Sequence, residues 1–119
     1  MRFNSHTSSR NIHSIPICFA FDGTNIYAHR ANPDAQRWKN VEKNDAVSVE
    51  MDHYVDDWSD LKGVMIYGKA SFLDSGPEQK KAVSLLKQKY SQYQQRLSDS
   101  VVVVKVAPTR VISWGALSK

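Results

Sequence analysis

The chain has 119 residues, of which 41% are hydrophobic and 24% charged, a composition typical of one globular domain spanning residues 1–119. No apolar run approaches the roughly 20 residues that a membrane-spanning helix needs. Sixteen Lys and Arg against twelve Asp and Glu leave a net charge of +4, which is compatible with an anionic ligand but does not require one. A membrane protein and a chain of several domains are therefore disfavoured.

The amino terminus and the cysteine content indicate the compartment. The opening residues, MRFNSHTSSRN, lack the apolar core of a secretory signal. The single cysteine, Cys18, rules out an intrachain disulfide and a multi-cysteine metal site. We therefore expect a protein of the reducing cytoplasm, in which Cys18 is a small buried residue rather than a nucleophile.

The first third of the chain predicts β-structure. Residues 2–8 are a candidate strand, and residues 12–21 alternate as a strand should. One face of this second strand would be the core face and the other would carry small groups. The core face would hold Ile15, Ile17, Phe19 and Phe21, and the small face Ser14, Pro16, Cys18 and Ala20. Asp22–Asn25 is a turn signal, and residues 26–30 read as the returning strand of a hairpin.

A helix and two strands follow. Asn32 is a candidate N-cap and Pro33 a candidate first residue of a helix over 32–44. Residues 46–54 and 63–74 predict strands, with a bulge or bend at Gly68. The longest helix is expected to begin near Pro77, and two last strands are expected over 101–106 and 110–114.

The order of these elements predicts a mainly β fold. Six or seven strands with short connections favour an antiparallel sheet curled into a small barrel, with two main helices over its sides or ends. No glycine-rich phosphate-binding loop of the parallel-sheet folds occurs in the sequence. We therefore expect any ligand site to be built in another way.

Residues 51–60, MDHYVDDWSD, are unusually polar and aromatic for a connection between two strands. A metal site is one interpretation, although neither zinc-ligand spacing nor a calcium loop is present. A polar turn is a second, because Asp and Ser favour turns. A pocket wall is the third, since Trp58 beside His53 and Tyr54 would give a flat ligand a surface to pack on.

A basic cluster follows the predicted hairpin, at a strand end and in the next helix. It contains His29, Arg30, Arg37 and Lys39. A phosphate there would meet the positive end of a helix dipole, free backbone N–H groups and guanidinium groups. Alternatively, Arg37 and Lys39 are ordinary solvated residues. The other bases share the solvated face of the long helix with Glu and Gln, so a nucleic-acid partner is weakly supported.

Several segments carry a resemblance to a known family when they are read in order. They are HSIPICFAFDGTNIY, RWKNVEKNDAVSV and VMIYGKASFL, to which DHYVDDWSDLKGV and LLKQKYSQY add a more specific pattern. Over roughly residues 3–114 the chain resembles the pyridoxamine 5'-phosphate oxidase-like family, the flavin- and deazaflavin-binding split β-barrels. The last two segments are similar to a subgroup that depends on a deazaflavin, coenzyme F420.

The resemblance implies an oxidoreductase that binds coenzyme F420 or FMN at the interface of a homodimer and transfers a hydride to or from a small organic substrate. The alternatives are a pyridoxamine 5'-phosphate oxidase-like FMN protein and a flavin-binding module without turnover. His53 and Tyr54 would lie near the substrate, with Trp58 as a stacking wall and no metal. The expected cofactor-binding residues are Ile15, Pro16, Ile17, Cys18, His29, Arg30, Arg37, Lys39, Lys62, Gly63 and Trp114.

Overall fold

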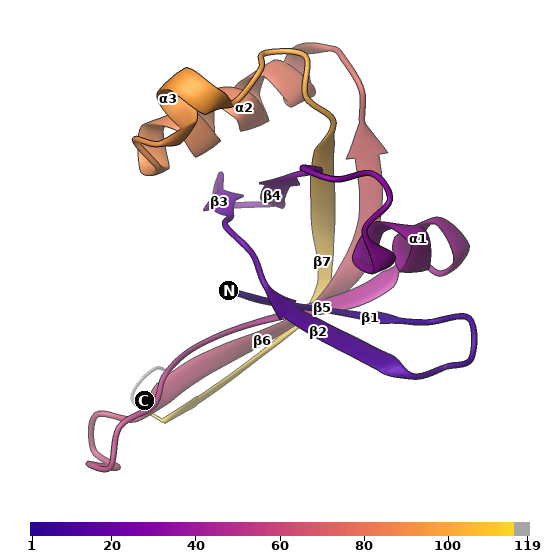
Figure 1. Cartoon of the computed structure of the whole chain (residues 1–119). Coiled ribbons are helices and arrows are strands. Elements are labelled where there is room, and N and C mark those ends of the chain that lie inside the picture. Colours follow the sequence, from indigo (N-terminus) through magenta and orange to yellow (C-terminus); the bar gives the residue numbers. More distant parts are fainter. Residues whose placement is uncertain (116–119) are drawn as a thin grey trace.

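A single antiparallel sheet of seven strands dominates the computed structural model, which describes residues 1–115 (Figure 1). The strands are β1 (Arg2–His6), β2 (Ile12–Pro16), β3 (Ala20–Phe21), β4 (Ile26–His29), β5 (Ala46–His53), β6 (Lys62–Leu73) and β7 (Val103–Gly115). The helices are α1 (Gln36–Lys43), α2 (Pro77–Lys89) and α3 (Tyr93–Arg96). The predicted mainly β split barrel with flanking helices is confirmed.

The connection between β2 and β3 explains why the sheet curls. The strand order is β2-β1-β5-β6-β7-β4-β3, so β2 and β3 are the two outermost strands. They are nevertheless consecutive in the chain, joined only by residues 17–19. Such a short link brings the two ends of the sheet together, and the barrel is split at this link. We call residues 17–19 the seam.

Two apolar clusters hold the fold together. The first fills the barrel and includes Phe3 and Trp38, whose ring centroids are 5.5 Å apart. The second lies between α2 and the strands β3, β4 and β7, with Tyr27 and Leu86 fully buried in it. The helix α1 therefore seals the barrel through Trp38, while α2 covers the outside of the sheet, as Figure 1 shows.

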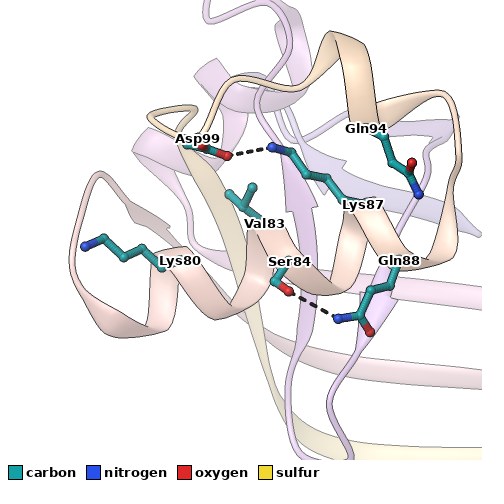
Figure 2. Close-up of a pocket in the computed structure, with 7 residues that line it drawn as sticks. All are labelled: Lys80, Val83, Ser84, Lys87, Gln88, Gln94 and Asp99. Atoms are coloured by element: carbon teal, nitrogen blue, oxygen red, sulfur yellow. Dashed lines mark hydrogen bonds and ion pairs between the residues drawn. The ribbon is translucent and has the colours of Figure 1, made fainter.

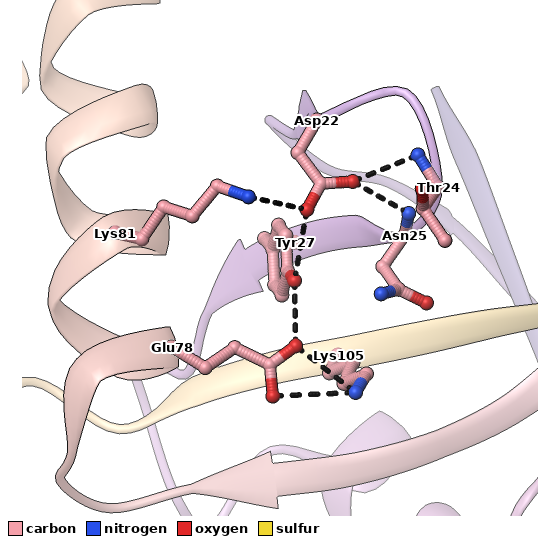
Figure 3. Close-up of polar contacts among 7 residues, drawn as sticks. All are labelled: Asp22, Thr24, Asn25, Tyr27, Glu78, Lys81 and Lys105. Atoms are coloured by element: carbon pink, nitrogen blue, oxygen red, sulfur yellow. Dashed lines mark hydrogen bonds and ion pairs between the residues drawn. The ribbon is translucent and has the colours of Figure 1, made fainter.

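A polar network fixes α2 onto the hairpin β3–β4 (Figure 3). The buried hydroxyl of Tyr27 lies 2.7 Å from the Glu78 carboxylate and 3.2 Å from the Asp22 carboxylate. Lys105 pairs with Glu78 at 2.9 Å, and Lys81 pairs with Asp22 at 3.1 Å. Hydrogen bonds from the backbone N–H groups of residues 25 and 24, then the contact with Lys81, hold the pKa of Asp22 well below its usual range. Each carboxylate thus has a cationic partner.

The strand predicted over 12–21 is interrupted at the seam. The N–H of Ile17 donates to the carbonyl of Met1, and the N–H of Phe19 donates to the hydroxyl of Tyr90, so neither follows a strand ladder. The alternation is also wrong at its end, because Ala20 is buried and Phe21 is exposed. The chain reverses its faces as it crosses from β2 to β3.

The helix predicted over 32–44 begins later than expected. Asn32 does not cap it, since its side-chain oxygen accepts a hydrogen bond from the N–H of Asp34 in a local turn. The helix α1 begins at Gln36 after the extended residue Ala35. Residues 32–34 therefore form a turned entry to the helix, and the first helical turn lies closer to Arg37 than the sequence indicated.

The two strands predicted at the carboxy end are one strand, β7. Between Tyr67 and Gly68 the pairing shifts, because Tyr67 pairs with Arg110 whereas Gly68 pairs with Pro108. The extra residue, Thr109, donates its hydroxyl to the carbonyl of Tyr67. This bulge accommodates a proline without an N–H inside a strand, and the bulge predicted at Gly68 is confirmed. We call residues 48–67 and 110–115 the arm. They are the parts of β5, β6 and β7 on the side of the bulge that leads to loop 54–61, together with that loop.

Candidate functional site

The residues expected to form one site lie at opposite ends of β6. His29 pairs with Val103, which pairs with Leu73 at the last residue of β6. Lys62 is the first residue of the same strand and pairs with His53. At roughly 3.3 Å per residue the two ends of β6 are about 35 Å apart along the strand. One chain therefore presents two separate groups at the two ends of β6, the strand that Figure 1 shows running from the tip of the arm toward the helices.

The first group is Cys18, His29, Arg30 and Arg37, which we call the barrel group. His29 ends β4 and is half-buried, with its Nδ1 atom 3.0 Å from the hydroxyl of Tyr93. Burial, and then the nearby charge of Arg37, lower the pKa of His29. The imidazole is therefore neutral near pH 7, and Arg37 lies close enough to affect its ionisation.

The guanidinium groups of Arg37 and Arg30 are oriented by aromatic rings. Arg37 lies over the ring of Trp38 at 5.1 Å, and its Nε atom is buried without a hydrogen-bond partner. Arg30 lies over the ring of Phe72 at 5.0 Å. Neither forms an ion pair within residues 1–115. Lys39 is exposed on α1 and makes no contact with this group in the described part of the chain.

Cys18 is exposed, so the expectation of a buried cysteine is wrong. The physical reason is the seam, which leads Cys18 away from both strand ladders and toward α3. There the thiol lies beside the Tyr93 hydroxyl, and burial, followed by the contact with Cys18, raises the pKa of Tyr93. Of the neighbouring residues expected to contact a cofactor, Ile15 and Ile17 are half-buried and Pro16 is exposed.

The second group lies on the arm, and we call it the arm group. Trp114 pairs with Gly63 across β6 and β7, and its indole ring fills the space that a side chain on residue 63 would occupy. Lys62 lies 3.9 Å from Asp60, whose other oxygen is 3.0 Å from Nε2 of His53. His53, Lys62, Gly63 and Trp114, which were predicted on separate segments, thus lie on paired strands at one end of the sheet. The arm group consists of His53, Tyr54, Trp58, Lys62, Gly63 and Trp114.

Loop 54–61 presents its aromatic residues to solvent. Trp58 is 85% exposed and Tyr54 is 79% exposed. Asp57 accepts hydrogen bonds from the hydroxyl and the N–H of Ser59, which lower its pKa and close a turn. Among residues 1–115 no group of three or more His, Cys, Asp or Glu side chains gathers as a metal site would. Asp57 thus serves a turn of the loop, and Asp60 contacts His53.

A hollow on α2 and α3 contains none of the expected site residues. It has a volume of about 510 Å³ and is lined by Lys80, Val83, Ser84, Lys87, Gln88, Gln94 and Asp99 (Figure 2). Lys87 crosses it to pair with Asp99 at 2.6 Å.

Within the described chain, no helix is long and apolar enough to cross a membrane.

Three residues near the barrel group had no role assigned from the sequence. Tyr93 contacts His29, Tyr90 contacts the backbone of Phe19, and Nζ of Lys89 lies 3.4 Å from the centre of the Phe19 ring. All three belong to the segment LLKQKYSQY, which was recognised only as part of a family pattern. The helical spacing could not reveal them, because they act across the fold on the seam and on β4.

The comparison of the sequence with protein families decides the identity of the fold. The family model of pyridoxamine 5'-phosphate oxidase matches residues 6–115. The chain belongs to the pyridoxamine 5'-phosphate oxidase family. The resemblance of the sequence segments to this family is thereby confirmed, and the likeness of two of them to the F420-dependent subgroup stays a prediction. No curated protein matches the sequence.

Solved structures with the same fold bind different ligands, according to their names. A heme-binding protein from Mycobacterium smegmatis aligns with a TM-score of 0.82 at 13% identity, over 99% of this chain and 49% of that one. An FAD-binding protein from Mesorhizobium loti aligns at 0.75 and 16% identity, over 94% and 80%. An F420 reductase aligns at 0.68 and 14% identity, over 93% and 86%. At these identities the alignments establish the shared pyridoxamine 5'-phosphate oxidase fold.

The barrel group has the donors that an anionic group would need. The buried Nε–H of Arg37 lacks an acceptor, and a phosphate oxygen would supply one. Arg30 and Arg37 both lack a carboxylate partner in the described chain. The arm group offers the flat indole of Trp114, whose packing on Gly63 depends on that residue having no side chain.

Proposed function

We propose that this protein is an oxidoreductase that binds coenzyme F420 or FMN and transfers a hydride between that cofactor and a small organic substrate. The observation that carries the proposal is the unpartnered, buried Nε–H of Arg37 beside His29, in a family whose fold is shared by an F420 reductase and an FAD-binding protein. A phosphate-bearing flavin-type cofactor satisfies that donor.

The proposal includes a two-fold homodimer. The barrel group and the arm group lie at opposite ends of β6, so one cofactor cannot contact both within one chain. In a two-fold dimer the arm of one protomer reaches the barrel group of its partner, and two equal sites result. The arm also carries the exposed apolar side chains of Tyr67, Val111 and Ile112, which a partner would cover.

Each part of the chain has its own task in this proposal. The bound cofactor supplies the hydride chemistry. Arg37 and Arg30 hold its phosphate, and the small residues of β2 and the seam leave room for its ring. Trp114 limits the depth of the ring pocket by covering Gly63. His53 and Tyr54 contact the substrate, while the exposed indole of Trp58 packs over it and excludes water.

Cofactor titration tests the proposal. The purified protein is titrated with FMN and with coenzyme F420, and binding is followed by absorbance and fluorescence. Arg37→Ala is expected to weaken binding by about 1.5–3 kcal/mol, the scale of a charge-assisted hydrogen bond. Lys43→Ala is the matched control, because it removes the same charge from the other end of α1.

The outcomes separate the alternatives. Equal cofactor dissociation constants for the wild type and Arg37→Ala would mean that Arg37 is an ordinary solvated residue. Binding of FMN alone would favour a pyridoxamine 5'-phosphate oxidase-like FMN protein. Tight cofactor binding, with no oxidation of the reduced cofactor by any small electron acceptor, would favour a flavin-binding module without turnover.

A further inference from the structure

The segment Lys89–Tyr93 connects the helices α2 and α3 to the barrel group. Tyr90 accepts a hydrogen bond of 3.2 Å from the N–H of Phe19 in the seam. The rings of Tyr90 and Tyr93 meet edge to face at 5.4 Å. Tyr93 in turn packs its ring against His29, with centroids 4.9 Å apart and an interplanar angle of 77°. The two tyrosines therefore form one rigid aromatic unit that contacts the seam and β4.

The hydroxyl of Tyr93 is the hydrogen-bond partner of one ring nitrogen of His29. Burial, and then the neighbouring Cys18, raise the pKa of Tyr93, so the hydroxyl keeps its proton and can donate it. The oxygen is 3.0 Å from Nδ1 of His29. A neutral imidazole has one N–H and one acceptor nitrogen. If the tyrosine donates to Nδ1, the imidazole proton is on Nε2.

The free nitrogen of His29 then becomes a donor. Nε2 of His29 makes no hydrogen bond within residues 1–115. The orphan Nε–H of Arg37 is on the same side of the fold: Arg37 lies over the Trp38 ring, and Arg30, the residue after His29, lies over the Phe72 ring, whose centroid is 6.4 Å from that of Trp38. The opposite tautomer would leave Nε2 as an acceptor, which repels an anion. The tautomer thus decides whether His29 assists Arg37 or opposes it.

We infer that Tyr93 is a positioning residue that holds His29 in the Nε2–H tautomer, so that His29 and Arg37 together donate to one anionic group of a bound cofactor. The inference deepens the proposed function, on which its cofactor part rests. No side chain other than Tyr93 is within hydrogen-bonding distance of Nδ1 in the described chain. Tyr93 itself touches no cofactor atom in this role.

The titratable and charged groups that face His29 come from every element packed on it. They are Arg37 from α1, Tyr93 from α3 and Cys18 from the seam through Tyr93, with Arg30 next in the chain. None of them is a carboxylate. Without the Tyr93 hydroxyl, no group in this set favours one neutral tautomer over the other, so a mixture is expected.

Nitrogen-15 NMR of the histidine side chains tests the inference without a cofactor. The His29 signals are assigned by their loss in His29→Gln, and the shifts of the two ring nitrogens report which one is protonated. In the wild type near pH 7.5 we expect Nε2–H. In Tyr93→Phe, which keeps the ring, we expect a mixture with Nδ1–H, and Tyr90→Phe is the matched control that leaves the tautomer unchanged.

The results decide between the assignments. A wild-type His29 with the proton on Nδ1 would overturn the inference, and this measurement does not depend on the folding of any variant. An unchanged tautomer in a folded Tyr93→Phe would also overturn it. FMN and coenzyme F420 are then titrated, and Tyr93→Phe is expected to lose about 3- to 10-fold in affinity. If wild type shows the Nε2–H tautomer but binds neither cofactor, the proposed function fails while the tautomer assignment stands.

Discussion

The indole ring of Trp114 lies over Gly63, and the two residues pair directly across β6 and β7. A Cβ atom on residue 63 would overlap the six-membered part of that ring. Gly63→Ala must therefore displace the indole. We expect a loss of about 1 kcal/mol in the free energy of unfolding and a changed near-ultraviolet circular dichroism signal.

The neighbouring substitution Lys62→Ala serves as the control, since Lys62 contacts Asp60 and not the ring. Urea denaturation and near-ultraviolet spectra are compared for the two variants. A Gly63→Ala protein with the wild-type spectrum and stability would mean that the indole moves freely, and the close fit of these two residues would have no consequence.

Trp58 gives a second prediction. Its side chain is 85% exposed, so its removal should change the stability of the folded monomer little. Trp58→Ala should keep the melting temperature within the range of surface substitutions, about 0.5 kcal/mol in stability. It should lower the affinity for cofactor or substrate by roughly 1–3 kcal/mol, through loss of a flat apolar contact. Thermal melting and cofactor titration check the two parts. Wild-type affinity in the variant would leave residues 51–60 as a polar connection.

Assembly provides a third prediction. A two-fold dimer would have twice the 13.5 kDa mass of the chain. Light scattering at micromolar concentration should report that mass, and Ile112→Asp should shift it toward the monomer, because Ile112 is an exposed apolar residue of the arm. Ser71→Asp, at an exposed position of β6, is the control for the charge change. A monomer that still binds cofactor tightly would contradict a site shared between protomers.

The network around Asp22 predicts how stability depends on pH. The pKa of Asp22 is lowered in the folded state from its ordinary value of 3.8, chiefly by the N–H groups of Asn25 and Thr24. The unfolded chain therefore binds more protons in acid, and the stabilisation is present above about pH 4 and lost as pH falls further. Asp22→Asn should cost about 1 kcal/mol at pH 7 and flatten the acid limb of the stability curve.

Urea denaturation at pH 7, 5, 4 and 3 measures this effect. Asp34→Asn is the control, because Asp34 is an exposed carboxylate in the turned entry to α1. Parallel curves for the wild type and Asp22→Asn would show that the network does not contribute to acid stability. The expected result is a smaller loss between pH 5 and pH 3 in Asp22→Asn than in either other protein.

Much of the fold could be predicted from the sequence because local signals agree with it. The turn at Asp22–Asn25, the bulge at Gly68 and the start of α2 at Pro77 each depend on residues that restrict the backbone. The seam could not be predicted, because Ile17 and Phe19 donate to Met1 and Tyr90, far apart in the chain. In the sequence, large apolar and small residues alternate through residues 17–19, although the hydrogen-bonded strand pairing stops there.

The candidate site was predicted less completely than the fold. Arg37 and His29 were predicted because basic residues gather on one short stretch, and in the structure burial and then the charge of Arg37 lower the pKa of His29. Tyr93 was missed, since its contact with His29 spans 64 residues of sequence. The separation of the barrel group and the arm group along β6 was also missed. The sequence motifs indicate which residues belong to a site, but not that a strand of 12 residues lies between the two groups.

The bulge at Thr109 also restricts how the arm can change over evolutionary time. Side chains alternate along β6 and β7, so the loss or gain of one residue beyond the bulge would turn every arm side chain to the opposite face. Trp114 would then leave Gly63. An insertion or deletion that keeps Trp114 over Gly63 must therefore add or remove two residues of a strand, or be matched by a second change at the bulge residue Thr109. The arm can lengthen or shorten only in steps of about 7 Å, two residues of strand.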